Sequence, residues 1–233
     1  MRRAEAYGDE VGEPRGSLDR AFADLYWAIG AHDDCLASAG RALAQPDPRD
    51  SGAFIPWLHV GRVRAAREDR GGALTAYEHV EAGLRRRDFP YTRGLLLLAR
   101  ADLAGPQDAA DLATQALDLA RARRFPDLET AALTTRAAAF LAAGQAAQAR
   151  ADSQAAVARL PAYAPRDDFA RPLLVHHRVL TALGDVAADA PLQQALTWLE
   201  GAVQQVPAEY RDAFLNVQGT HRAMQALASA CRR

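Results

Sequence analysis

The sequence contains no lysine: all 28 of its basic residues are arginines. A chain without lysine cannot build a Schiff base with a carbonyl substrate, a Ser-Lys dyad or the Gly-Lys-Ser/Thr loop that cradles nucleotide phosphates. These three classes of active site are therefore excluded. The arginines are balanced by 29 acidic residues to a formal net charge of −1. This balance predicts no general attraction to nucleic acid or to an anionic membrane.

Cysteine is scarce, and long apolar runs are missing. The two cysteines, Cys35 and Cys231, lie far apart and form neither a disulfide framework nor a CxxC motif, which fits a reducing cytoplasm. The run LLLLA at 95–99 is much shorter than the roughly 20 residues that span a bilayer. The first residues lack the apolar core of a secretory signal. We therefore expect a cytoplasmic protein with no membrane partner.

Aromatic residues make up only 7% of the chain, and runs of β-branched residues are rare. The hydrophobic fraction is nevertheless 49%, much of it alanine, which favours helices and lets them approach closely. No segment shows the alternation of a strand. The composition predicts an all-α protein. Gly and Pro signals delimit the expected helices: 17–29, 32–44, 53–67, 72–86, 92–103, 107–123, 127–142, 146–159, 167–182, 190–204, 208–215 and 219–231.

Small residues recur along these helices at a nearly constant spacing. The positions are Cys35, Ala73, Ala110, Ala149 and Ala195, separated by 38, 37, 39 and then 46 residues. Three of these positions come five residues after a glycine: Gly30, Gly105 and Gly144. A period of roughly 20–50 residues is typical of helical repeat arrays. The longer last interval indicates an insertion around GDVAADAP.

The second expected helix pair carries the fullest pattern. Trp57, Val60, Gly61, Ala73 and Tyr77 stand at relative positions 0, 3, 4, 16 and 20. This spacing resembles the tetratricopeptide repeat (TPR), in which a large residue, a Leu-Gly-like pair, a small residue and an aromatic recur at these offsets. Physically, Gly61 and Ala73 let two helices cross closely, while Trp57 and Tyr77 fill the ends of the crossing.

The resemblance covers about residues 17–207. Pro161 and Pro207 each follow a small position by twelve residues and match the proline that ends the second helix of such repeats. The resemblance implies a right-handed α-solenoid of about five TPR-like helix pairs. Residues 1–16, with several glycines among charges, are expected to form a flexible arm.

The end of the sequence resembles the segment that closes many TPR-like arrays in bacterial signalling and transcriptional regulators. The likeness rests on Arg211, Phe214, Leu215, Asn216, His221 and Arg222. Physically, a solenoid exposes an apolar end that an amphipathic helix can cover. We therefore expect C-terminal capping helices over 208–233. No NTPase, cyclase or helix-turn-helix module accompanies the array here, so we expect either a stand-alone adaptor or the separated part of a regulator.

Three sets of residues suggest chemistry, and each has a structural alternative that we favour. His176 and His177 invite a metal, but neighbouring helical residues point about 100° apart and no HExxH motif exists. The HDD sequence at 32–34 follows a glycine turn, where acids complement a helix N-terminus. Cys35 occupies a small-residue position, which predicts buried packing rather than a nucleophile. We expect no metal, no cofactor and no enzymatic activity.

Two arginine clusters raise an alternative function. They occupy 85–87 and 121–124, each at the end of a second helix, where cations favour the helix dipole. We interpret them as solvated helix ends. A nucleic-acid-associated regulator using these clusters remains the alternative hypothesis, and nucleic acid is the less favoured partner.

The favoured hypothesis places a binding groove on the first helix of each pair, because first helices line the concave wall of such a stack. The expected groove residues are Arg20, Asp24, Leu58, Arg62, Arg171, Leu174 and Arg178. Arginine forks pair bidentately with carboxylates, so an acidic peptide or protein segment suits this wall. The sequence thus predicts a non-enzymatic scaffold or adaptor in bacterial regulation, with a homodimer left open.

Overall fold

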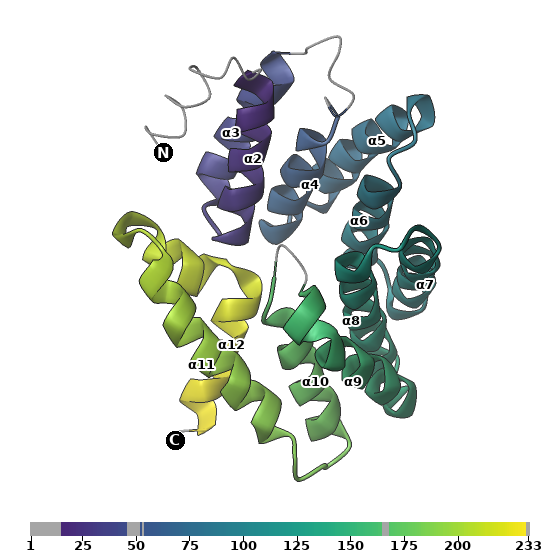
Figure 1. Cartoon of the computed structure of the whole chain (residues 1–233), viewed down its shortest axis with the longest axis vertical. Helices are drawn as coiled ribbons and strands as arrows, with labels where there is room; N and C mark the ends of the chain where they lie inside the picture. The colour runs from purple at the N-terminus through teal and green to yellow at the C-terminus, as the bar shows by residue number, and fades with distance from the viewer. Residues whose placement is uncertain (1–14, 46–51, 53, 165–167, 232–233) are drawn as a thin grey trace. The chain divides into compact units, whose positions relative to one another are not determined.

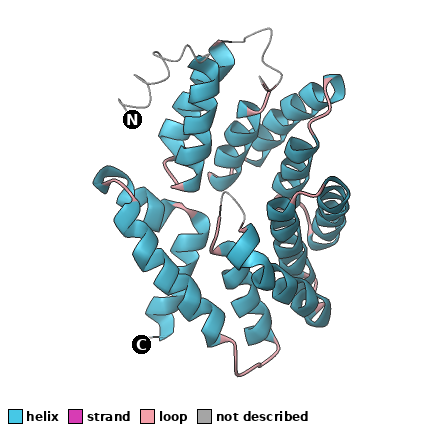
Figure 2. Ribbon diagram, in the orientation of Figure 1, coloured by secondary structure: helices cyan, strands magenta, loops and turns pink. Residues whose placement is uncertain are grey.

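The chain is described here by a computed structural model that covers residues 15–45, 52, 54–164 and 168–231. Over these ranges the secondary structure is helical and contains no strand (Figure 2), which confirms the predicted all-α class. The chain divides into two compact units, Met1–Phe89 and Pro90–Arg233. Most of the arm predicted over 1–16 lies outside the described residues, because the first helix begins at Arg15.

The unit Met1–Phe89 consists of two helix pairs in its described part. Their bounds are α2 (Arg15–Ala28), α3 (His32–Ala44), α4 (Pro56–Ala66) and α5 (Arg70–Arg86). Each helix packs against its neighbour in sequence, and the first helices α2 and α4 also touch one another. In Figure 1 these four helices run from purple to blue.

The unit Pro90–Arg233 continues the alternation of first and second helices. Its helices are α6 (Pro90–Ala101), α7 (Pro106–Arg123), α8 (Pro126–Ala142), α9 (Ala146–Tyr163), α10 (Arg171–Ala182), α11 (Asp189–Gln205) and α12 (Gly219–Cys231). Proline occupies the first turn of several of them, where its missing N–H costs no hydrogen bond. The first helices α6, α8 and α10 pack in a row, and α12 lies against α10 and α11 (Figure 1).

Two details of the predicted secondary structure were wrong. The helix predicted over 208–215 is replaced by a 3₁₀ turn at Ala208–Tyr210 and a π-helical turn at Ala213–Val217. Pro161, expected to end a helix, lies inside α9, which continues to Tyr163. A proline this close to a helix end removes few backbone hydrogen bonds and is tolerated there. Pro207 behaves as predicted, because α11 ends at Gln205.

Four of the first helices end in the same left-handed turn. Gly30, Gly144 and Gly184 have φ near +70°, at +75°, +75° and +66°, and Glu68 takes the same place with φ of 64°. At Gly30 the turn is closed by hydrogen bonds from Gly30 N to Trp27 O and from Ala31 N to Tyr26 O, and the other three turns repeat this pattern. The turn satisfies the last carbonyls of the helix and reverses the chain. Gly105, which also stands five residues before a small residue, does not form this turn: its φ is −66° and it is the residue before α7.

The five periodic small residues all lie in the core. Cys35, Ala73, Ala149 and Ala195 are 0% exposed, and Ala110 is 4% exposed. The crossing of α4 and α5 has the expected geometry, because a Cβ atom placed on Gly61 would lie 2.2 Å from Cε1 of the Tyr77 ring. Trp57 stacks on His79 beside this crossing, with 4.3 Å between ring centroids. Small side chains therefore set how closely the helices pack.

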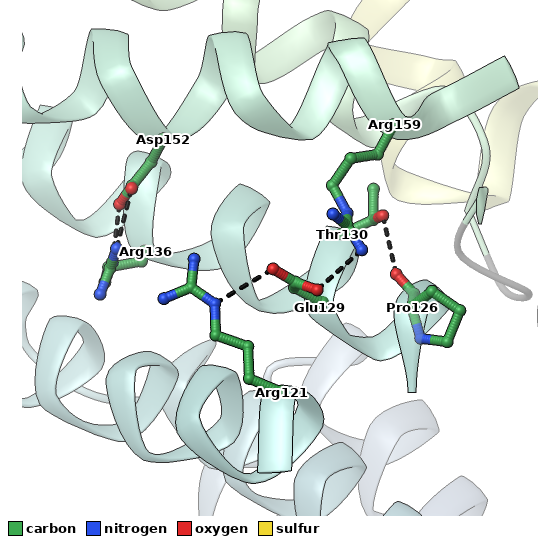
Figure 3. A network of polar contacts seen from close by, with 7 residues as sticks. All are labelled: Arg121, Pro126, Glu129, Thr130, Arg136, Asp152 and Arg159. Carbon is green, nitrogen blue, oxygen red and sulfur yellow. Dashed lines mark hydrogen bonds and ion pairs between the residues drawn. The ribbon is translucent and has the colours of Figure 1, made fainter. Parts of the chain in front are cut away.

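A row of polar contacts joins three successive helices of the second unit (Figure 3). Glu129 on α8 accepts from Arg121 on α7 at 3.1 Å and from Arg159 on α9 at 2.7 Å. Seven residues further along α8, Arg136 donates to both carboxylate oxygens of Asp152 on α9 at 2.7 and 2.8 Å. Arg121 and Arg159 stand 38 residues apart in the sequence. The sequence period thus brings equivalent positions of α7 and α9 to one carboxylate.

Candidate functional site

The first unit brings two of the predicted groove residues to the line of contact between α2 and α4. Asp24 and Trp27 are three residues apart on α2, and His59 and Arg62 are three residues apart on α4, so each pair shares a helix face. Asp24 Oδ1 lies 2.6 Å from His59 Nε2, and the Arg62 guanidinium lies 5.6 Å from the centroid of the Trp27 ring. These four residues are called the α2–α4 seam.

The two members of the Asp24–His59 pair differ sharply in exposure. The His59 side chain is 4% exposed, whereas that of Asp24 is 70% exposed. The carboxylate can only accept, so a neutral His59 donates from Nε2 and carries a bare Nδ1. Nδ1 is buried without a hydrogen-bond partner. A buried ring therefore holds an exposed carboxylate in one orientation.

The other half of the seam is aromatic. His32 stacks on the Trp27 ring at 5.7 Å with nearly parallel planes. Burial lowers the pKa of His32, and the nearby Arg67 guanidinium lowers it further, against the opposing charge of Asp33. Asp33 itself accepts from Arg67 at 2.5 Å, and this hydrogen bond lowers the pKa of its carboxyl. Asp33, the first acid of HDD, is thus paired with Arg67 at the end of α4, in the next helix pair.

Cys35 lies beneath the seam as a packed residue. It is 0% exposed, and its Sγ donates to Ala23 O at 3.4 Å, which confirms the packing interpretation. Burial raises the pKa of the Cys35 thiol to about 12; Arg62 acts in the opposite direction, and Asp24 raises it slightly more. The thiolate, the nucleophilic form, is therefore negligible near neutral pH.

We expect the native chain to leave Cys35 unmodified by iodoacetamide at about pH 8, because a thiol with a pKa of about 12 carries almost no thiolate there. Peptide mass spectrometry after a short labelling pulse resolves the Cys35 peptide from other thiols. The same pulse in urea provides the control, where Cys35 should react at the rate of an ordinary thiol. Fast native labelling would contradict the buried position.

The remaining predicted groove residues of the first unit do not extend the seam equally. Arg20 is half-buried, and its Nη2 donates to Ser17 Oγ at 3.1 Å. Leu58 is only 1% exposed and belongs to the core. It therefore stabilises the helix packing and offers no side-chain surface to a partner.

In the second unit, the structure does not bring Arg171, Leu174 and Arg178 together as a binding set. Arg171 on α10 donates to both oxygens of Asp102, just after α6, at 2.5 and 3.5 Å. Leu174 is 3% exposed and packs in the core. Arg178 is exposed on α10. Arg171 thus links two first helices that flank α8, a role that the sequence did not indicate.

The two adjacent histidines of α10 face different neighbours. His176 Nδ1 lies 3.0 Å from Ser153 Oγ on α9, whereas His177 Nδ1 lies 2.9 Å from Ala188 O. Burial is the main cause that lowers the pKa of His176; Arg150 adds to it and Asp185 opposes it. Within the described ranges, no three His, Cys, Asp or Glu side chains gather as metal ligands would. Among the described helices, none has the length and apolar character needed to cross a bilayer.

The arginine clusters are exposed at the ends of α5 and α7. Arg85 lies 3.4 Å from Glu81 one turn earlier, and Arg121 shares Glu129 with Arg159. Part of the positive charge in each cluster is therefore matched by a carboxylate of the chain. Each cluster occupies a helix C-terminus, as the solvated-end interpretation predicted.

Sequence reasoning missed two members of the seam, Trp27 and His59. The signal was available: Trp27 lies three residues after Asp24, and His59 three residues before Arg62, both within predicted first helices. Comparison of the chain with protein-family models, with curated proteins and with solved structures gave no match in any of the three.

Proposed function

We propose that this chain is a TPR-like helical-repeat scaffold that binds a protein or peptide segment without catalysing a reaction, in bacterial regulation or signalling. The observation that supports the proposal is the α2–α4 seam. It combines an exposed, oriented carboxylate at Asp24 with a guanidinium held over an indole at Arg62 and Trp27. Trp and Arg are enriched among the residues that dominate protein interfaces. The right-handed solenoid sense stays a prediction from the sequence resemblance.

The chemistry of the seam suggests how a partner segment would be recognised. Arg62 is ordered by Trp27, so its planar fork loses little freedom when it pairs with a partner carboxylate. Asp24 is fixed by His59 and suits a cationic group or a backbone N–H of the same segment. A peptide with an acidic residue near a basic one fits both.

The nucleic-acid alternative has less support. Its arginine clusters are partly neutralised by Glu81 and Glu129, and the formal net charge of the chain is −1. Strong sequence-independent binding to phosphates requires many uncompensated cations. Steeply salt-dependent binding of a DNA or RNA oligonucleotide, abolished by Arg85→Ala and Arg86→Ala, would restore the alternative.

The test uses a displayed library of random peptides selected on the immobilised full chain. We expect enriched peptides with an acidic residue, and about a tenfold weaker Kd when Arg62→Ala removes a charge-assisted pair worth roughly 1.5–3 kcal/mol. Asp24→Ala should weaken the same peptides. Fluorescence anisotropy provides the Kd values.

Arg86→Ala is the matched control, because Arg86 is an exposed arginine of the same unit on α5. It should leave the Kd of the selected peptides unchanged. Circular dichroism must show that the melting temperature of Arg62→Ala stays within a few degrees of the wild type. Peptides that bind both seam variants as tightly as the wild type would reject the seam as the binding site.

A further inference from the structure

The π-helical turn and α12, together Ala213–Cys231, form a segment that packs on α10 and α11 and is tied by hydrogen bonds to Asp168. We call it the clasp segment. Asp168, just before α10, accepts hydrogen bonds from Gln218 Nε2 at 3.3 Å and from the Thr220 hydroxyl. The other oxygen of Asp168 accepts from the backbone N–H of Arg171 at 3.0 Å. One carboxylate therefore ties the clasp segment to the first turn of α10.

His221 lies at the centre of the clasp segment and is 2% exposed. Its ring is 4.3 Å from the Phe214 ring of the π-helical turn and 5.5 Å from Trp198 of α11. Its Nδ1 lies 2.8 Å from Phe214 O. Trp198 in turn stacks on Phe169 at 5.0 Å. The imidazole thus joins α12, the π-helical turn and α11 in a largely aromatic environment.

The hydrogen-bond partner of His221 determines its protonation state. A carbonyl oxygen can only accept a hydrogen bond, so Nδ1 of His221 is protonated and donates to Phe214 O. Nε2 is buried and has no hydrogen-bond partner, which suits the bare nitrogen of a neutral ring. A second proton on Nε2 would place both a charge and an unsatisfied N–H among aromatic rings, and both are costly.

The charged groups around the His221 ring offset only part of the cost of protonating it. Burial has the largest effect on His221 and lowers its pKa, although the hydrogen bond to Phe214 O and the negative charge of Asp168 both act in the opposite direction. Three charged side chains near the clasp segment have other partners. Arg171 pairs with Asp102, Arg211 donates to Val206 O, and Asp212 accepts from Asn216. Glu200 of α11 and Arg222 of α12 are exposed.

We propose that His221 is a proton-sensitive latch: its neutral ring keeps the clasp segment docked on α10 and α11, and its protonation releases the segment and uncovers the aromatic surface around Trp198. The π-helical turn suits this role, since such turns are rare and occur frequently at functional sites. The inference does not depend on the α2–α4 seam, which belongs to the other unit.

The direction of the effect follows from linkage between protonation and docking. The undocked His221 has the ordinary pKa of about 6.5, and the docked ring has a lower pKa. Above about pH 6.5 both states are neutral, and docking is fully favoured. As the pH falls below that value, the undocked state takes up protons first, so docking weakens until the pH reaches the docked pKa.

Hydrogen exchange of the full chain tests the proposal at about pH 7.5 and about pH 5.5, after correction for the intrinsic pH dependence of exchange. At the lower pH, the opening equilibrium of amides in the clasp segment should increase by at most about tenfold. This limit follows because about pH 5.5 lies one unit below the ordinary histidine pKa. Amides of α8 should show no such increase. An unchanged opening of the clasp segment in the wild type would overturn the proposal.

Two variants separate the latch from ordinary acid sensitivity. His221→Asn keeps an amide donor for Phe214 O, and His221→Phe keeps most of the ring volume. In either variant, the opening of the clasp segment measured by hydrogen exchange should no longer increase between about pH 7.5 and about pH 5.5. This holds even if the variant already opens more often than the wild type at neutral pH. His176→Asn is the matched control on α10, because His176 is another histidine with a lowered pKa, and it should keep the pH dependence of the clasp segment. Equal pH dependence in the wild type and in a folded His221 variant would also overturn the latch.

Discussion

Replacing Gly61 by alanine should destabilise the first unit by about 2 kcal/mol, although alanine favours a helix over glycine by about 1 kcal/mol. The added Cβ would lie 2.2 Å from Cε1 and 2.6 Å from Cδ1 of Tyr77, far inside van der Waals contact. The Tyr77 ring is 1% exposed and cannot swing into solvent. Helices α4 and α5 would therefore have to separate. Urea unfolding followed by tryptophan fluorescence in a Trp198→Phe background reports on this unit, which contains Trp27 and Trp57.

Gly40→Ala is the matched control for this substitution. Gly40 lies in α3 of the same unit, and a Cβ built there meets no atom within 4 Å. This variant should therefore gain about 1 kcal/mol from helix propensity alone. The double variant Gly61→Ala with Tyr77→Leu should be more stable than the sum of the two single effects predicts, because the shorter side chain relieves the clash. A neutral or stabilising Gly61→Ala would show that the crossing is not set by the glycine.

Arg136→Met should destabilise the second unit by about 3 kcal/mol, the cost of leaving a buried carboxylate without its partner. The Arg136 and Asp152 side chains are 20% and 12% exposed, and the two bonds between them are charge-assisted and bidentate. Hydrogen bonding to Asp152 is the main cause that raises the pKa of Arg136. Urea unfolding followed by circular dichroism measures the loss.

Arg150→Met is the matched control for Arg136→Met. Arg150 of α9 pairs with Asp185 at 2.8 Å, but its side chain is 52% exposed, so its removal should cost about 0.5 kcal/mol or less. The double variant Arg136→Met with Asp152→Leu should recover most of the lost stability, because two apolar side chains leave no unpaired charge. Equal effects of Arg136→Met and Arg150→Met would contradict the special role of the buried pair.

Much of the fold follows from local signals in the sequence. Proline at helix starts, glycine after first helices and alanine at a period near 38 residues placed most helices within a few residues of their observed bounds. The π-helical turn at Ala213–Val217 was not predicted, because it depends on Phe214 and His221 meeting through tertiary contact. Glu68 likewise takes a left-handed turn that the sequence alone assigns to glycine. At Glu68 the local backbone hydrogen bonds from Glu68 N to Ala65 O and from Asp69 N to Arg64 O close the same turn without a glycine.

The candidate site was only partly predictable. Asp24 and Arg62 were identified from their expected place on first helices, and the structure shows both at the contact of α2 with α4. Leu58 and Leu174 were assigned to the same wall but lie in the core, since a helix face that meets two neighbouring helices leaves little side chain exposed. The partnership of Arg171 with Asp102 joins residues 69 positions apart and has no local signal.

The Arg171–Asp102 bridge also bears on the mechanics of the second unit. It connects the end of α6 to the start of α10, two helices separated in sequence by α7, α8 and α9. Straightening this row of first helices would separate Arg171 from Asp102 and break the bridge. Both partners are partly exposed, so added salt would screen their attraction. The bending stiffness of the second unit should therefore decrease as the ionic strength rises.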